Sequence, residues 1–178
     1  MIKAAMKVRR ANPNDADEVA RVHVDAWNFT YAGFMPADYL SSLSYDAFAK
    51  GWAADIAKAD ENQPRWVAES NGAIVGFLIA GSGGLEVPGY PNELRAIYTK
   101  PGVQRAGTGK ALFQAYRDWL MARGEDKFHL WVGKQNERAH RFYEAMGGQR
   151  VAERSDRKFG GMVIPEWGYG FSAGASLE

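Results

Sequence analysis

The chain has 178 residues, of which 22 are basic and 21 acidic, so its formal net charge is +1. This length suits a single domain, and a hydrophobic content of 46% is enough for a core. With no cysteine and three histidines, the chain lacks a disulfide framework, a thiolate metal site and a cysteine nucleophile, and a histidine-rich metal site is not expected. The composition predicts no membrane span, no secretory signal and no nucleic-acid partner. We therefore expect a cytoplasmic globular protein.

The near-zero charge hides an uneven distribution along the chain. Residues 12–61 contain nine acidic and three basic side chains, a net charge of −6. Residues 95–158 contain fourteen basic and seven acidic side chains, a net charge of +7. One interpretation is that exposed helix faces simply differ in sign. The other is that the acidic segment meets a cationic ligand and the basic segment an anionic one.

The first half of the chain predicts an opening strand, two helical regions and a β-hairpin. Asn12 or Asn14 can cap the first helix, and Pro13 suits its first turn. Apolar residues recur in that helix with a period near 3.6, and Asn71-Gly72 is typical of a two-residue hairpin turn. In chain order we expect a strand at 6–11, a helix starting at 12–15, a helical region at 36–58, strands at 66–69 and 73–80, and a loop at 81–91.

The second half alternates strands and helices. We expect a strand at 93–99, a turn at 104–110, a helix ending near 124, a strand at 128–132, a helix at 136–146, and terminal strands at 150–153 and 162–171. Two strand–loop–helix–strand passages indicate a single α/β or α+β domain with a mixed sheet.

The turn between the strand at 93–99 and the next helix carries the strongest local signal, Gln104-x-x-Gly107-x-Gly109. A helix N-terminus has unpaired backbone N–H groups, and glycines let a polyanion approach them closely. A phosphate or pyrophosphate is the expected ligand. The alternative is a plain turn that needs glycine only for its backbone geometry. A Walker loop fails because Gly102-x-x-x-x-Gly107 is followed by Thr108-Gly109 where Lys-Ser/Thr is required. A dinucleotide fingerprint fails because it needs three spaced glycines, of which only Gly107 and Gly109 are correctly placed.

At this turn the sequence resembles the GNAT N-acetyltransferase superfamily, whose acyl-CoA signature is Arg/Gln-x-x-Gly-x-Gly/Ala after the fourth strand. The strand before the turn ends in Pro101, as in the family, and Asn136-x-x-Ala139-x-x-Phe142-Tyr143-Glu144-x-x-Gly147 resembles a second CoA-side motif. The resemblance implies a mixed, mostly antiparallel sheet flanked by helices and splayed between the fourth and fifth strands. It also implies one acetyltransferase domain over residues 1–178, with its core at about 7–170. Separately, we interpret the last two residues, Leu177-Glu178, as a cloning remnant.

The resemblance implies that acetyl-CoA is the cosubstrate. The backbone of the fourth strand would pair with the pantetheine arm, and the turn amides would hold the pyrophosphate. The residues so implicated are Ile97, Tyr98, Thr99, Gln104, Arg105, Ala106, Gly107, Thr108, Gly109, Lys110, Asn136 and Arg138.

Tyr143 stands where the family places the general acid for the leaving thiolate. A phenol pKa near 10 and a thiol pKa near 8.5 keep that proton transfer modest in energy. A core aromatic beside Phe142 is the alternative. Gly148 departs from the family, because many relatives carry an aromatic there, and this departure puts the local packing in doubt.

A base must take a proton from the amine before it attacks, and the absence of cysteine favours direct transfer over a cysteine-linked acyl-enzyme. Glu93 occupies a position where some relatives carry this base, and an exposed strand-end acid is the alternative. His129 and His140 are weaker candidates, and His129 reads as a hydrogen-bonded core histidine. His23 faces either the core or the acceptor pocket.

The segment at 27–35 corresponds to the family's acceptor site, and Trp27 and Tyr31 could cage a cation. An aromatic core under a loop is the alternative. Their spacing also resembles a subgroup that includes bacterial polyamine acetyltransferases. We therefore expect acetyl transfer to a small cationic amine. Acetylation of a peptide N-terminus or lysine, and a CoA-binding regulatory module without turnover, remain as alternatives. Relatives are often dimers, so a homodimer is a candidate assembly.

Overall fold

The computed structural model describes residues 6–81, 87–103 and 106–176. The chain divides into two compact units, residues 1–80 with 96–115 and residues 81–95 with 116–178. Two elements, β4 (Asn92–Thr99) and α4 (Thr108–Ala122), pass from one unit to the other. Among the described residues, no helix is long and apolar enough to cross a lipid bilayer.

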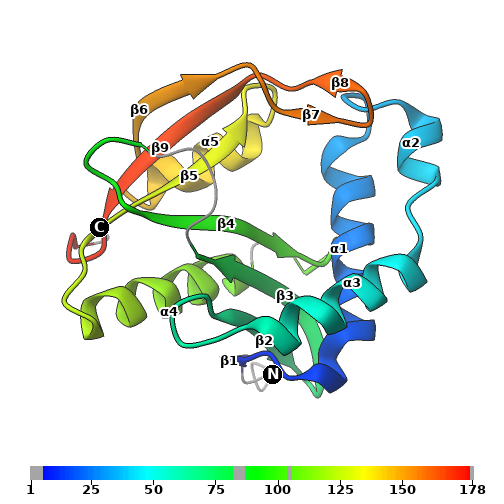
Figure 1. Cartoon of the computed structure of the whole chain (residues 1–178), viewed down its shortest axis with the longest axis horizontal. Coiled ribbons are helices and arrows are strands. Elements are labelled where there is room, and N and C mark those ends of the chain that lie inside the picture. Colours follow the sequence, from blue (N-terminus) through cyan, green and yellow to red (C-terminus); the bar gives the residue numbers. More distant parts are fainter. Residues whose placement is uncertain (1–5, 82–86, 104–105, 177–178) are drawn as a thin grey trace. The chain divides into compact units, whose positions relative to one another are not determined.

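The first unit is an antiparallel sheet with helices packed on it (Figure 1). The strands β1, β2 and β3 pair in that order, and β4 follows β3. Helix α1 contacts β3, and α3 packs on α1. Besides its parts of β4 and α4, the unit contains β1 (Met6–Arg10), η1 (Pro13–Asp15), α1 (Ala16–Tyr31), α2 (Ala37–Ser41), α3 (Tyr45–Lys58), β2 (Arg65–Ser70) and β3 (Ala73–Ala80).

The local signals in this half explain its elements. Asn12 caps the first helical turn, because its side chain accepts from the Asn14 amide while its own amide donates to Asp15. Asn71 and Gly72 have φ values of 53° and 77°, the left-handed pair that a two-residue hairpin requires. The helical region expected at 36–58 is two helices, because the chain leaves the helix at 42–44 and Ser44 caps a new one by accepting from Ala47.

The second unit contains the parallel pair of the sheet. Its strands run in the order β4-β5-β9-β6, where β4 and β5 are parallel and the other pairs are antiparallel. The mixed, mostly antiparallel sheet is therefore confirmed. The further elements are β5 (Lys127–Gly133), α5 (Glu137–Ala145), β6 (Gln149–Arg154), β7 (Lys158–Phe159), β8 (Met162–Val163) and β9 (Glu166–Ser172).

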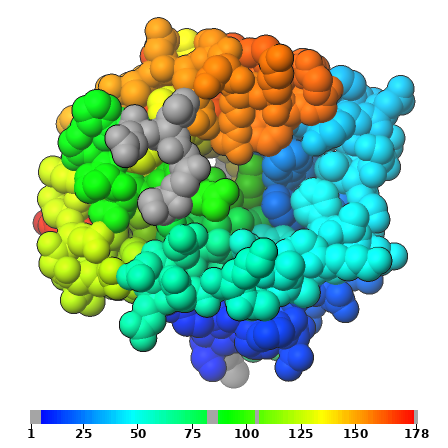
Figure 2. Space-filling model, in the orientation of Figure 1, coloured from blue at the N-terminus to red at the C-terminus, as the bar shows by residue number. Residues whose placement is uncertain are grey.

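The single strand expected at 162–171 is wrong. Residues 158–163 form a small hairpin, β7–β8, around Gly160 and Gly161, and β9 begins only after Pro165. Both glycines have positive φ, so the turn signal was present in the sequence. Strands β6 to β8, orange in Figure 2, form exposed surface of this unit, to which Val151, Met162 and Val163 contribute apolar side chains.

The ladder between β4 and β5 is short. In the described chain its register consists of Asn92 with Phe128 and Glu93 with His129. This is what the family resemblance implies for strands that separate after their first residues. Glu93 and His129 therefore form the last registered pair.

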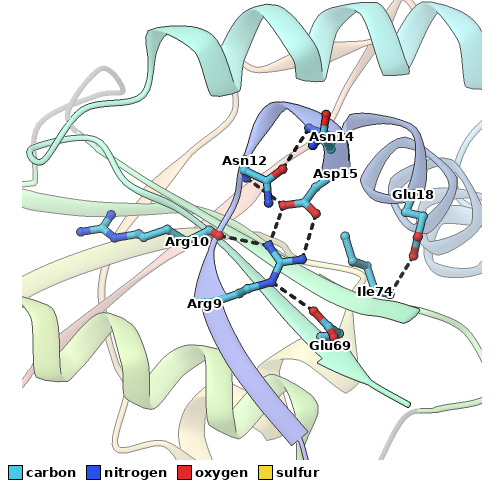
Figure 3. A network of polar contacts seen from close by, with 8 residues as sticks. All are labelled: Arg9, Arg10, Asn12, Asn14, Asp15, Glu18, Glu69 and Ile74. Carbon is cyan, nitrogen blue, oxygen red and sulfur yellow. Dashed lines mark hydrogen bonds and ion pairs between the residues drawn. The ribbon is translucent and has the colours of Figure 1, made fainter. Parts of the chain in front are cut away.

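An ion-pair network ties the start of the chain to β2 (Figure 3). Arg9 donates to both carboxylate oxygens of Asp15, at 2.7 and 2.9 Å, and to Glu69 at 3.1 Å. Burial opposes ionisation of Asp15, but the hydrogen bonds from Arg9 and the Asn12 amide outweigh it and hold the pKa of Asp15 below its usual value. Asp15 is thus a structural anion.

His23 lies in the aromatic core of the first unit. Its ring centroid is 4.9 Å from those of Phe48 and Phe77, and it stacks on Tyr98 at 5.7 Å. Trp52 Nε1 donates to His23 Nδ1 at 3.1 Å, so the proton of the neutral ring is on Nε2. Burial lowers the pKa of His23 to about 4. Of the two sequence interpretations, the structure supports a core histidine.

The packing of the second unit explains why position 148 is a glycine. A Cβ at this position would lie 2.7 Å from ring atoms of Phe171 and 2.8 Å from the carbonyl oxygen of Tyr143. Phe171 therefore fills the space that a side chain at 148 would need. The departure from the family pattern is matched by an aromatic ring supplied from β9.

We expect His23 to make the protein less stable in acid. Its pKa of about 4 in the folded state is below the unfolded value near 6.5, so the unfolded chain binds more protons between these pH values. The free energy of unfolding should fall as pH drops from 6.5 to 4, by up to about 3 kcal/mol. Urea denaturation at several pH values measures this.

His23→Gln keeps an acceptor for Trp52 and should flatten the dependence between pH 4 and 6.5. Asp15→Asn is the control, because it removes a titration that lies at lower pH. Equal slopes for the wild type and His23→Gln across this range would contradict the assignment.

Candidate active site

The turn before α4 presents backbone amides at the helix N-terminus. Ala106 and Gly107 are exposed, and the first backbone bond of the helix runs from the Ala111 amide to the Gly107 carbonyl. The amides of residues 107–110 therefore precede the internal hydrogen bonds of the helix. Gln104 and Arg105, which the sequence assigns to the same site, lie outside the described residues.

The residues of this turn fit a phosphate group. Gly107 has φ +88°, and a Cβ there would meet no atom of the described residues within 4 Å, so the space is open on their side. The Thr108 hydroxyl is buried and has no hydrogen-bond partner in the described parts of the chain. Thr108 and Gly109 start α4, and Lys110 is exposed, so amides and a cation lie together.

Gly76 on β3 lets the start of α4 and the end of β4 come close. A Cβ at this glycine would lie 3.0 Å from both Thr108 Cγ2 and the Tyr98 carbonyl oxygen, and 3.2 Å from Leu112. Gly76 was not among the site residues expected from the sequence. A glycine in the middle of an otherwise apolar strand was the available signal, because it marks a close approach of another chain segment.

The last residues of β4, Ile97, Tyr98 and Thr99, are half-buried. The Tyr98 side chain packs into the aromatic core, 5.7 Å from the Phe77 ring, and its hydroxyl lies 2.9 Å from the Tyr31 hydroxyl. The side chain is thus held by the core of the unit, which fixes the backbone of this strand.

Trp27 and Tyr31, the candidate acceptor residues, belong to the same aromatic cluster. Their rings are 5.2 Å apart in an edge-on arrangement, and Trp27 lies 5.5 Å from His23. The hydroxyl contact to Tyr98 extends the cluster to β4. Aromatic faces and phenol oxygens of this kind suit a cation.

Much of the −6 charge of residues 12–61 is already engaged within the fold. Asp15 binds Arg9, Asp55 binds Arg65 at 2.5 Å, and Glu18 accepts from the Ile74 amide. Asp25 and Asp60 also accept hydrogen bonds. The acidic segment is therefore partly structural, and its net charge is weaker evidence for a cationic ligand than the sequence indicated.

In the second unit, Tyr143 is buried on α5. Its ring is 6.2 Å from those of Tyr169 and Phe171 and 5.2 Å from Phe142. Asn136 caps this helix through its side-chain oxygen, which accepts from the Ala139 amide at 3.1 Å. The cap fixes the helix start, and that bond leaves the side-chain NH₂ of Asn136 for a ligand. Arg138 is exposed in the first turn.

Glu93 is buried at the start of β4, so it is not the exposed strand-end acid of the alternative interpretation. It lies beside His129 in parallel register. His140, a weaker sequence candidate, is structural, because its Nε2 contacts the Lys134 carbonyl at 3.2 Å and its Nδ1 the Tyr169 hydroxyl at 2.9 Å.

The predicted residues thus fall into two sets. The glycine turn, the end of β4, Trp27 and Tyr31 belong to the first unit, and Glu93, His129 and the α5 residues belong to the second. The first set can bind an anion and pack against a cation. The second offers a buried carboxylate, an imidazole and a phenol for proton transfer.

Comparisons with known proteins agree with this assignment. Residues 22–148 match the model of the acetyltransferase (GNAT) family. The chain is 36% identical over 172 residues to an uncharacterized N-acetyltransferase, YuaI, of Bacillus subtilis, covering 96% of this chain and 95% of that one. It is 23% identical over 146 residues to a spermidine N(1)-acetyltransferase of Thermoplasma acidophilum, covering 80% and 88%.

Among solved structures, the PaiA N-acetyltransferase from Thermoplasma acidophilum in complex with coenzyme A has the same fold. Its TM-score is 0.75 at 18% identity, with 94% of this chain and 99% of that chain covered. The family match over most of the chain and the 36% identity along nearly all of it show that this chain belongs to the GNAT family of acetyltransferases.

Proposed function

We propose that this GNAT-family N-acetyltransferase transfers the acetyl group of acetyl-CoA directly to the primary amine of a small cationic acceptor. The observation that carries the proposal is the open turn before α4, where Gly107 is left-handed and the buried Thr108 hydroxyl has no partner in the described chain. The complex of a structural neighbour with coenzyme A supports the same ligand. Residues 7–170 would form one catalytic domain, acting in the cytoplasm.

A cationic acceptor is supported by two observations. Trp27, Tyr31 and Tyr98 offer aromatic faces and hydroxyl oxygens in one cluster. The chain is also similar over most of its length to a spermidine N(1)-acetyltransferase. A polyamine combines a primary amine with further positive charges, so it is the acceptor class that these residues fit best.

We assign the following roles to the backbone and side-chain groups of the site. Acetyl-CoA supplies an acetyl thioester. The amides of residues 107–110 and the Lys110 ammonium bind its pyrophosphate, and the backbone of residues 97–99 pairs with its pantetheine arm. Asn136 and Arg138 contact the same arm and its phosphates. Glu93 contributes a buried carboxylate on the path of the amine proton, and Tyr143 gives its proton to the departing sulfur.

Gly107→Trp should abolish acetyl-CoA binding, because the indole would fill the open space before α4. We expect the dissociation constant to rise by about 100-fold or more in titration calorimetry. Gly102→Trp is the matched control, since Gly102 has the same φ of +88° and equally open surroundings but lies outside the turn amides. Equal affinities of the two variants would contradict the site.

The acceptor class is tested by thiol release from acetyl-CoA across polyamines, amino acids, aminoglycosides and peptides. The highest kcat/KM should occur with a polyamine, and Trp27→Ala should raise the KM for that amine by about 3- to 30-fold without changing the KM for acetyl-CoA. Best turnover with peptides would point to N-terminal or lysine acetylation. Tight acetyl-CoA binding without turnover of any amine would point to a regulatory module.

Tyr143→Phe should lower kcat by about 100-fold or more and leave acetyl-CoA affinity within about twofold, because only the proton donor is lost. Tyr116→Phe is the control: this phenol is also buried, and burial, followed by the charges of Glu125 and Glu93, raises its pKa. Steady-state kinetics and calorimetry measure both variants. An unchanged kcat for Tyr143→Phe would remove Tyr143 from the chemistry.

A further inference from the structure

His129 on β5 is a buried histidine whose two ring nitrogens differ in their hydrogen bonding. Its Nδ1 atom lies 2.7 Å from the Tyr90 carbonyl oxygen. A carbonyl only accepts, so Nδ1 carries the proton, and Nε2 of the neutral ring has a lone pair. This Nε2 atom is buried and has no hydrogen-bond partner among the residues that the structure describes.

The other two histidines of the chain have the opposite arrangement. His23 accepts at Nδ1 from Trp52, which puts its proton on Nε2. His140 donates from Nε2 to the Lys134 carbonyl, and its Nδ1 meets the Tyr169 hydroxyl. In these two rings every basic nitrogen is already engaged, so His129 is the histidine whose lone pair can receive a proton from a ligand.

Trp131 repeats the pattern on the same face of β5. It lies two residues beyond His129, its ring is 6.3 Å away at 81°, and its Nε1 is also buried without a partner in the described segments. A buried polar group left unpaired costs about 1–3 kcal/mol. The acceptor His129 Nε2 and the donor Trp131 Nε1 both lack a partner in the described residues, which indicates a place for a polar ligand group.

A carboxylate is the registered neighbour of His129 on this face. Glu93 on β4 is its registered neighbour, so both side chains lie on one face about 5 Å apart at their strands. Tyr90 packs its ring over Gly170 of β9, and Arg154 of β6 covers the Trp131 ring at 4.2 Å while paired with Glu166 at 2.6 Å. The arginine is thus neutralised, and the nearest registered charge is the Glu93 carboxylate.

We propose that His129 Nε2 is the general base that takes the proton from the acceptor amine, with Glu93 stabilising the imidazolium that forms. This rests on the proposed acetyltransferase function. The ammonium loses one proton to Nε2, and its nitrogen then bonds to the acetyl carbon as the C–S bond breaks. The nitrogen of the new amide then loses its excess proton to solvent. The departing thiolate takes the proton of the Tyr143 hydroxyl, and solvent reprotonates Tyr143. His129 finally releases its proton to solvent.

The kinetic test compares the pH profiles of kcat/KM with a good amine substrate. The wild type should lose activity on acidification, and His129→Gln should lack this limb and turn over about 100-fold or more slowly. Its acetyl-CoA affinity and circular dichroism should be unchanged. His140→Gln is the matched control, which should keep the acid limb. Glu93→Gln should also keep it, because the base is still present.

Two further measurements do not depend on the Gln variant. Long-range ¹H–¹⁵N NMR of the ligand-free protein should show His129 protonated at Nδ1 and His23 and His140 at Nε2, with signals assigned by the three variants. His129→Ala should regain part of its activity when imidazole is added. Wild-type kinetics in His129→Gln, or an Nε2–H tautomer at His129, would overturn the proposal. A wild type that acetylates no amine would instead overturn the proposed function.

Discussion

The placement of β4 is the constraint on which both parts of the site depend. Its first two registered residues are held by the parallel pair with β5, and its last residues are held by the aromatic core around His23. Glu93 and Tyr98 are only five residues apart, yet one belongs to each compact unit. The end of β4 that the aromatic core holds, residues 97–99, is the part for which we propose pairing with the pantetheine arm.

Most buried polar side-chain atoms of the described residues have a hydrogen-bond partner, so the few that lack one are informative. Arg65 is buried, but it binds Asp55 and the Ala80 carbonyl. Thr108 Oγ1, His129 Nε2 and Trp131 Nε1 have no such partners within the described residues. Because unsatisfied buried groups are costly, they persist where a ligand or water completes them. These atoms fall at the start of α4 and on one face of β5, the places to which the proposals assign phosphate binding and proton transfer.

Charge counted along the sequence was a less direct guide than hydrogen bonds in space. The acidic segment looked like a surface for a cation, but Arg9 and Arg65, which flank it in the chain, neutralise Asp15 and Asp55. The aromatic cluster of Trp27, Tyr31 and Tyr98 now carries more of the case for a cationic acceptor. These side chains also pack in the core, so the cluster is compatible with both interpretations, an aromatic core and a site for a cationic acceptor.

The sequence by itself determined the family and most of the elements, because these follow from local rules. The spacing of Gly107 and Gly109 before an amphipathic helix, the Asn71-Gly72 turn and the Asn136 cap each depend on residues close in the chain. The hairpin at 158–163 was missed although its glycine pair is local. Only the tertiary structure decided which nitrogen of each histidine is engaged, that Gly76 admits α4 and that Phe171 replaces a side chain at Gly148. Those features depend on contacts between residues far apart in the chain, which no local pattern records.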